Sequence, residues 1–400
     1  MQKIHQPLML ALHRALQPIF NDRKQADKVI ELTLKANKKW GARDRAFIAE
    51  NTYEIVRWFR LLKFCTELPK VQTEQQWWDI VVAWLLIKGY SPSVLAGYSS
   101  ISAEKVRRKF EEAQVIRKVR ESIPDWLDRL GEEELGDAWD AELKAMNQPA
   151  DVFIRVNTLL TSLPQLQKLL AEEGIETEQV AGVMDALRLK KRSNIFRTSA
   201  FQNGLFEVQD AGSQLISEFL DVQSGMRVID ACAGAGGKSL HIATQMKNKG
   251  KVISMDIEEW KLMELKKRAK RQQISSIETR LIEPKTIKRL QNSADRLLLD
   301  VPCSGLGVLR RNPDTKWKMN EAFIEQIKET QAEIIQQYVS MLKPDGQLVY
   351  ATCSILPSES EVQVQKFLEK NTDFQLIEEK RTSPAKDGFD GFYMAKLSRR

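Results

Sequence analysis

Apolar residues in the first third of the chain recur at helical spacing. The spacing is clear in AFIAENTYEIVRWFRLLKF (Ala46 to Phe64), where charged residues flank an apolar stripe. WWDIVVAWLLIKGY (Trp77 to Tyr90) is apolar on most sides, which predicts a helix buried in a small bundle. Ser102 to Arg120 predicts one strongly basic helix, and glycine is scarce. We therefore expect residues 1–120 to form an all-helical domain.

The pattern changes after residue 120. ESIPDWLDRLGEEELGDAWDAEL (Glu121 to Leu143) is acidic, and this shift in composition predicts a boundary. From Val152 the segments are short, with strands expected in VFIRVNTLL, ALRLK and FEVQ and a helix in SLPQLQKLLAEEG. Residues 121–205 are therefore expected to be a linker and a small α+β subdomain.

The last part of the chain, residues 206–400, alternates strand and helix. Apolar strands are expected in MRVIDAC (226–232), KVISMD (251–256), RLLLD (296–300) and QLVYATC (347–353), with helices between them. FQLIEE and GFYMAKL predict a terminal hairpin. This order predicts an α/β fold, with a largely parallel sheet, helices on both faces and an antiparallel edge.

Composition excludes several classes of protein. The chain is 42% hydrophobic and 29% charged, as in ordinary soluble proteins, and its longest apolar run, Ile80 to Ile87, is too short for a membrane span. The N-terminus lacks the pattern of a secretory signal. Four cysteines without a CxxC pair, and only three histidines, argue against a metal site. Free thiols fit a reducing, cytoplasmic compartment.

Positive charge is concentrated near the N-terminus. Residues 1–120 hold 22 Lys and Arg against 12 Asp and Glu, whereas residues 121–400 hold 39 against 42. A basic surface can simply confer solubility. It can also attract a polyanion such as nucleic acid, and the segregation of the charge favours this second interpretation.

A glycine-rich loop lies between the first strand of the α/β region and its helix. DACAGAGGKS (Asp230 to Ser239) has neither the spacing of a Walker phosphate loop nor the third glycine of a dinucleotide loop. Its glycines still allow a tight turn and close approach to a ligand. Asp256 ends the next strand, where an acid can accept hydrogen bonds from a ribose. The loop suits S-adenosylmethionine best, with a purely structural turn as the alternative.

Two cysteines follow two apolar strands. Cys303 lies in DVPCSG and Cys353 in YATCSILPSESE, so both are expected at the edge of the sheet that also carries the glycine loop. Either could be a small core residue. Together they suit chemistry in which a thiolate adds to carbon 6 of cytosine and makes carbon 5 reactive towards a methyl donor. Ser358 and Glu361 form a capping-box pattern that predicts the start of the next helix.

These motifs resemble those of a known family, the RNA (cytosine-5) methyltransferases of the Sun/Fmu type. DACAGAGGK is similar to that family's DxCAAPGGK, and DVPCSGLGVLRRNPDTKW and YATCSILPSESE are similar to its two cysteine motifs. IRVNTL and FEVQDAGSQL resemble its preceding segments. GARDRAFIAENTYEIVRW resembles the NusB-like RNA-binding domain of some members. The resemblance implies a Rossmann-like methyltransferase domain over residues 206–400 and S-adenosylmethionine as cofactor.

The resemblance also implies roles for single residues. Cys353 would be the nucleophile, Cys303 would assist product release, and Asp300 would lie between cofactor and base. Asp256 would hold the ribose, and Glu283 would replace the usual aspartate on the adenine side. Ala235 stands where the family has proline, and Gly234 would preserve the turn. The methionine part of the cofactor would be wrapped by Cys232, Ala233, Gly234, Ala235, Gly236, Gly237 and Lys238.

The segment after Cys303 mixes basic and aromatic residues. Arg310, Arg311, Lys316 and Trp317 suit phosphate contact and base stacking, although they could equally be an ordinary charged loop. The expected partner is RNA, with ribosomal RNA of the 16S type first and transfer RNA as the alternative. Two other hypotheses are a non-catalytic RNA-binding assembly factor and methylation of an exocyclic amine, which needs no thiol. The sequence does not predict an oligomeric state.

Overall fold

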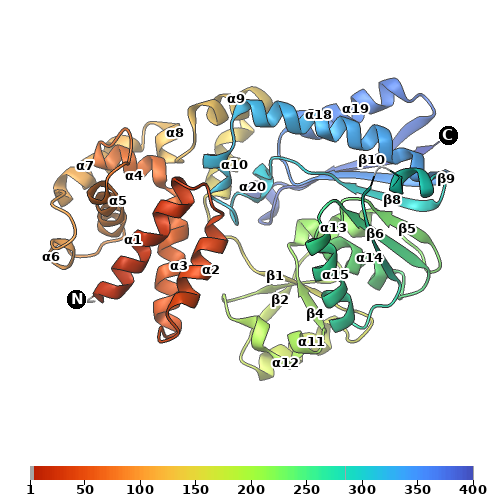
Figure 1. Ribbon diagram of the computed structural model, residues 1–400, viewed down its shortest axis with the longest axis horizontal. Helices are drawn as coiled ribbons and strands as arrows, with labels where there is room; N and C mark the ends of the chain where they lie inside the picture. The colour runs from red at the N-terminus through yellow and green to blue at the C-terminus, as the bar shows by residue number, and fades with distance from the viewer. Residues whose placement is uncertain (1–3, 284, 400) are drawn as a thin grey trace. The chain divides into compact units, whose positions relative to one another are not determined.

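The computed structural model describes residues 4–283 and 285–399, which form two compact units (Figure 1). The first unit comprises Met1–Gln148 and Leu309–Glu321, and the second comprises Pro149–Val308 and Ala322–Arg400. The chain thus leaves the second unit after Val308 and returns to it at Ala322. Among the described residues, no helix has both the length and the apolar character that a bilayer span requires.

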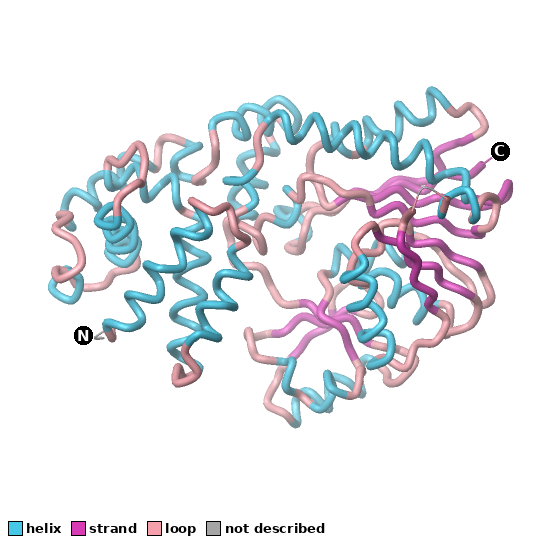
Figure 2. The backbone as a smooth tube through the Cα atoms, viewed as in Figure 1, coloured by secondary structure: helices cyan, strands magenta, loops and turns pink. Residues whose placement is uncertain are grey.

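The first unit is helical throughout, as Figure 2 shows by colour. Its centre is α5, whose residues Trp77, Ile80 and Val81 are at most 1% exposed, as expected for a buried bundle helix. The helices are α1 Gln6–Phe20, α2 Ala26–Ala36, α3 Ala42–Arg57, α4 Phe59–Thr66, α5 Glu74–Ile87, α6 Pro92–Leu95, α7 Ala103–Ala113, α8 Arg117–Arg120, α9 Asp125–Leu135, α10 Ala138–Met146 and the inserted α17 Thr315–Lys318.

The expected basic helix over 102–120 is wrong in one respect, because it is two helices. α7 ends at Ala113, and α8 begins only at Arg117. Between them Ile116 has an extended backbone, with φ −110° and ψ 94°. Val115 and Ile116 are adjacent β-branched residues, which lose side-chain freedom in a helix and so favour a break.

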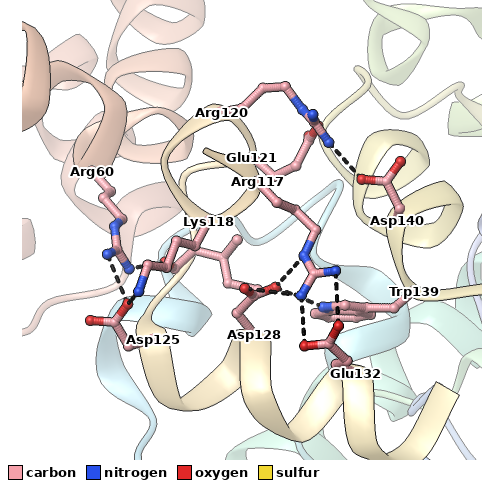
Figure 3. Close-up of polar contacts among 11 residues, drawn as sticks. Arg60, Arg117, Lys118, Arg120, Glu121, Asp125, Asp128, Glu132, Trp139 and Asp140 are labelled. Carbon is pink, nitrogen blue, oxygen red and sulfur yellow. Dashed lines mark hydrogen bonds and ion pairs between the residues drawn. The ribbon is translucent and has the colours of Figure 1, made fainter. Parts of the chain in front are cut away.

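The acidic segment after residue 120 pairs with the basic residues before it (Figure 3). Arg117 binds Asp128 at 2.9 Å and Glu132 at 3.0 Å, and Arg120 binds Asp140 at 2.5 Å. These contacts join α8 to α9 and α10 within one compact unit that extends to Gln148. The unit therefore runs past residue 120, and part of the N-terminal positive charge is already neutralised internally.

The second unit begins with a small antiparallel sheet of order β2-β3-β1-β4. Ile154 and Phe206 on this sheet pack against Leu166 and Leu170 of α11, and all four are fully buried. The elements are β1 Phe153–Val156, α11 Leu163–Glu172, β2 Thr177–Gln179, β3 Ala186–Leu189, η1 Ile195–Arg197, α12 Ser199–Gln202 and β4 Phe206–Val208. This is the expected α+β piece, with β2 as an additional strand.

A seven-stranded sheet of order β10-β11-β9-β8-β5-β6-β7 forms the rest of the unit. Strands β7, β6, β5, β8 and β9 are parallel, and β11 and β10 are antiparallel additions. The strands are β5 Arg227–Asp230, β6 Lys251–Asp256, β7 Ile277–Leu281, β8 Ala294–Asp300, β9 Leu342–Thr352, β10 Phe374–Arg381 and β11 Tyr393–Arg399. The parallel α/β sheet and the terminal hairpin are both confirmed.

Neighbouring residues of each strand face opposite sides of this sheet, and helices cover both sides (Figure 1). Val228 packs with α13, α14 and α15, whereas Ile229 packs with α18 and α19. The helices and turns are α13 Ala211–Phe219, α14 Gly237–Gln245, α15 Glu259–Arg271, α16 Thr286–Arg289, η2 Leu306–Val308, α18 Glu321–Tyr338, η3 Val339–Met341, η4 Pro357–Glu359, α19 Glu361–Lys370 and α20 Pro384–Asp387.

Candidate active site

Cys303 and Cys353 lie just beyond the ends of the adjacent parallel strands β8 and β9. Their Sγ atoms are 3.0 Å apart, and the backbone N–H of Cys353 donates to Sγ of Cys303 at 3.3 Å. Both are free thiols. The hydrogen bond to Cys353, burial and the nearby charge of Glu359 raise the pKa of Cys303 well above its usual range. Cys303 is therefore a neutral thiol that can donate a hydrogen bond to Cys353.

A lysine and an aspartate meet next to these thiols. Lys238, in the first turn of α14, places Nζ 2.5 Å from Oδ2 of Asp300 at the end of β8. Burial alone would lower the pKa of Lys238, but the charge and hydrogen bond of Asp300, with a contribution from Cys353, raise it. Lys238 is therefore a cation at neutral pH.

The glycine loop has the tight turn that the sequence predicted. Gly234 and Gly236 have φ of 54° and 87°, in the left-handed region that glycine favours. Gly236 donates to the carbonyl of Ala233 at 2.9 Å, and a Cβ on Gly236 would lie 2.0 Å from Leu265. A Cβ on Gly234 would meet no atom within 4 Å, so the loop is open on that side. Its backbone thus fits close approach by a small ligand.

Asp256 at the end of β6 supports this loop. Its Oδ2 accepts from the N–H of Gly234 at 2.9 Å, and its Oδ1 accepts from the N–H of Glu258 at 2.9 Å. Glu283 is exposed in the turn after β7, where the preceding Ile282 donates to the carbonyl of Asp256 at 3.0 Å. Asp256 and the Glu283 turn are thus brought together at the same sheet edge. Burial and the charges of Asp300 and Asp230 raise the pKa of Cys232, so it is a neutral thiol within the loop.

Two arginines outside the loop fix its carbonyls. Arg268 of α15 donates to Ala235 O at 2.6 Å, and the fully buried Arg155 of β1 donates to Gly237 O at 2.6 Å. Arg268 also binds Glu207 of β4, 3% exposed on its side chain, at 2.5 Å. The small sheet therefore helps to shape the loop. We did not predict these residues, although a charged Arg155 within the apolar strand FIRV was a signal.

The four residues assigned to RNA contact lie in the first unit. Lys316 is only 4% exposed, and Arg310 only 8%. Trp317 donates from Nε1 to Val56 O at 2.7 Å and packs edge-on to Phe59 with ring centroids 5.9 Å apart. Arg311 is half-buried. The expectation of an exposed stacking and phosphate-binding surface is therefore wrong for Lys316 and Trp317, because the chain after Val308 packs into the helical core.

The expected capping box after Cys353 is also wrong. Residues Pro357–Glu359 form the 3-10 turn η4, and α19 begins at Glu361 after the N-cap Ser360. Ser360 has an unusual backbone, with φ −121° and ψ −102°. Glu361 binds Arg381 instead of reaching back to the helix start. The segment thus turns once more before the helix, and this turn directs Glu359 inward.

Comparison with known proteins shows which family the two domains of this chain resemble. Residues 217–398 match the 16S rRNA methyltransferase RsmB/F family, and residues 123–196 match its RsmF/B-like ferredoxin-like domain. The probable ribosomal RNA small subunit methyltransferase B of Synechocystis is 37% identical over 66% of this chain and 60% of its own length. The ribosomal RNA small subunit methyltransferase B of Vibrio cholerae is 35% identical over 69% and 65%.

Among solved structures, the crystal structure of PH0851 covers 100% of both chains, with 24% identity and a TM-score of 0.83. This likeness supports the fold. The chain spans less than two thirds of the length of these two curated relatives. S-adenosylmethionine is the cofactor that the methyltransferase domain and its glycine loop indicate. The chain thus carries a methyltransferase domain of the RsmB/F (Sun/Fmu) family over residues 217–398 and the ferredoxin-like domain of that family over residues 123–196.

Proposed function

We propose that this protein methylates carbon 5 of a cytosine in RNA of the small ribosomal subunit. The observation that carries the proposal is the pair of thiols 3.0 Å apart at neighbouring strand ends, beside the glycine loop. Methylation of an exocyclic amine needs no thiol. A cytosine ring needs a nucleophile at carbon 6 before carbon 5 can attack a methyl group.

In this proposal Cys353 attacks carbon 6 as a thiolate. When bound, S-adenosylmethionine would supply an electrophilic methyl group to carbon 5 and leave as S-adenosylhomocysteine. The proton on carbon 5 would then pass to a water molecule, the carbon 6–sulfur bond would break, and Cys353 would leave as a thiolate. Lys238 places a positive charge beside the reacting groups, and the neutral Cys303 can hydrogen-bond to the departing sulfur.

Asp300 is proposed to hold the base. Its Oδ2 accepts from Lys238, whereas its Oδ1 makes no hydrogen bond with any described residue. Oδ1 can therefore accept from the ring N3–H that forms when the thiolate adds. The RNA-binding surface is proposed to include the helical unit. Its net positive charge would attract RNA phosphates, and this contribution to RNA affinity would fall as the salt concentration rises. The loop glycines, Cys232, Lys238, Asp256 and Glu283 are proposed as the cofactor contacts.

Methylation of transcribed small-subunit RNA and of transfer RNA, followed by bisulfite sequencing, tests this function. We expect one or a few methylated cytosines in ribosomal RNA, and we expect Cys353→Ala to lower the rate at least about 1,000-fold. Cys303→Ala should accumulate a covalent protein–RNA adduct, visible on a denaturing gel. Normal turnover by Cys353→Ala, or methyl groups only on exocyclic nitrogens, would refute the proposal. Methylation of transfer RNA alone would refute the ribosomal substrate.

A further inference from the structure

The buried carboxylate of Glu359 binds the residues that directly follow both cysteines. Glu359 of η4 is 0% exposed. Its Oε1 accepts from the hydroxyls of Ser304 at 2.5 Å and Ser354 at 2.6 Å. Its Oε2 accepts from the N–H of Ser304 at 2.8 Å and from the side-chain amide of Gln331 at 3.0 Å. Four donors thus satisfy this carboxylate, and none of the residues that the structure describes forms an ion pair with it.

The two serines are the residues directly after the two cysteines. One carboxylate therefore ties together the chain that follows Cys303 and the chain that follows Cys353. Gln331 of α18 also donates to Pro302 O at 3.0 Å, on the other side of Cys303. The hydroxyl of Tyr350 in β9 donates to Glu359 O at 2.8 Å, which fixes the turn to the strand. Both thiol-bearing segments are thus anchored to one side chain.

We propose that Glu359 is a positioning residue that sets the separation of the two thiols. The inference rests on the proposed function, in which Cys353 attacks and Cys303 assists the departure of its sulfur. Glu359 is fully buried, so it acts through Ser304 and Ser354. All four partner groups donate to the carboxylate here, and both serine hydroxyls already accept from a backbone N–H, Ser304 from Leu306 and Ser354 from Leu356. An amide at this position has one acceptor oxygen instead of two, so at least two of these four donations are lost. A displacement of about 1 Å between reacting groups can cost about 100-fold in rate.

Glu359→Gln is the direct test, because it keeps the volume and removes the charge. We expect kcat for RNA methylation to fall about 100-fold, with KM for RNA and for S-adenosylmethionine within twofold of wild type. In the Cys303→Ala background, adduct formation should slow similarly, because Cys353 itself is displaced. The matched control is Glu361→Gln, the same change two residues later, where the carboxylate binds Arg381 at 3.0 Å. This control should retain kcat within threefold.

Ser304→Ala and Ser354→Ala keep the test decisive if Glu359→Gln does not fold. Each removes one donor to the carboxylate and should lower kcat about tenfold, again without a change in KM. The inference is overturned if Glu359→Gln, or both serine variants, match the Glu361→Gln control in kcat. An effect on KM alone would also overturn it. Cys353→Ala separates the two proposals, since its normal turnover would refute the proposed function and not merely the role of Glu359.

Discussion

Two lysines with little exposed surface, Lys238 in one compact unit and Lys316 in the other, have pKa values shifted in opposite directions. Lys238 lies beside Asp300 in the second unit, and the carboxylate raises its pKa above the usual range despite burial. Lys316 lies in the first unit, where burial and the charge of Arg57 lower its pKa to about 7, against the weaker opposing pull of Glu121 and Glu54. The direction of the pKa shift therefore depends on whether a carboxylate forms a hydrogen bond with the lysine amine, and not on burial alone.

The two lysines differ in whether their charge is available for a reaction. A lysine held charged against an aspartate at a sheet edge can stabilise negative charge in a reaction. A lysine that burial drives towards neutrality contributes its aliphatic chain to packing and brings little charge to a polyanion. In the sequence, Lys238 lies in the glycine loop and Lys316 follows the Cys303 motif. Sequence reasoning therefore assigned Lys238 to cofactor contact and Lys316 to RNA contact.

Lys238→Met should have the largest effect. It removes the charge beside Cys353 and leaves Asp300 without its cation, so methyl transfer should fall about 100-fold or more. The rate of methyl transfer is measured in single-turnover reactions at saturating RNA and S-adenosylmethionine. Lys249→Met, which changes an exposed lysine just beyond the same helix, is the control and should be neutral. A Lys238→Met rate within threefold of the control would show that this pair is structural, and the comparison would fail.

Arg268→Met should weaken cofactor binding by about tenfold, or about 1.4 kcal/mol. The arginine fixes Ala235 O of the glycine loop as well as Glu207. Arg271→Met is the matched control, because Arg271 also pairs with Glu207 but has no bond to the loop. Calorimetric titration with S-adenosylmethionine measures the difference. Equal losses in both variants would assign the effect to Glu207 and not to the loop carbonyl.

Lys316→Met should raise stability by about 2 kcal/mol while changing RNA affinity less than twofold. The lysine titrates near 10.4 in the unfolded chain and at about 7 in the folded one, so the unfolded state binds more protons between these values. Wild-type stability therefore rises with pH across this window, and the gain from methionine is largest below pH 7 and shrinks towards pH 10.

Denaturant unfolding at pH 6, 8 and 10, with RNA binding measured alongside, checks the Lys316 prediction. Lys70→Met alters an exposed lysine of the same unit and should leave stability unchanged. A tenfold loss of RNA affinity in Lys316→Met without a gain in stability would restore the original interpretation of Lys316 as an RNA contact.

Local patterns predicted the second unit well for physical reasons. Apolar strands followed by turn residues specify parallel strands, and the shared edge of those strands brings Cys303, Cys353, Asp300 and the glycine loop together without further information. The conformational freedom of glycine likewise predicted the turn at Gly234 and Gly236. These features depend on residues near one another in the chain.

The residues that sequence reasoning missed depend on distant partners. Glu359 lies between Ser358 and Glu361, which were predicted to start a helix, and it received no role of its own, because nothing local shows that Ser304, 55 positions earlier, donates to its carboxylate. Arg155 reaches Gly237 across 82 positions. Lys316 and Trp317 follow Cys303 closely in the chain, but nearness in sequence did not make them part of the same unit.

The insertion of Leu309–Glu321 into the helical unit has a consequence for how this protein can be divided. No single cut in the gene separates the two units, since one part of the helical core is encoded between two strands of the catalytic sheet. A chain that begins at Pro149 retains Trp317 but loses Val56 and Phe59, which contact it. Recombination that adds or deletes only the N-terminal segment therefore leaves an apolar surface uncovered. The two units are, in this sense, inherited together.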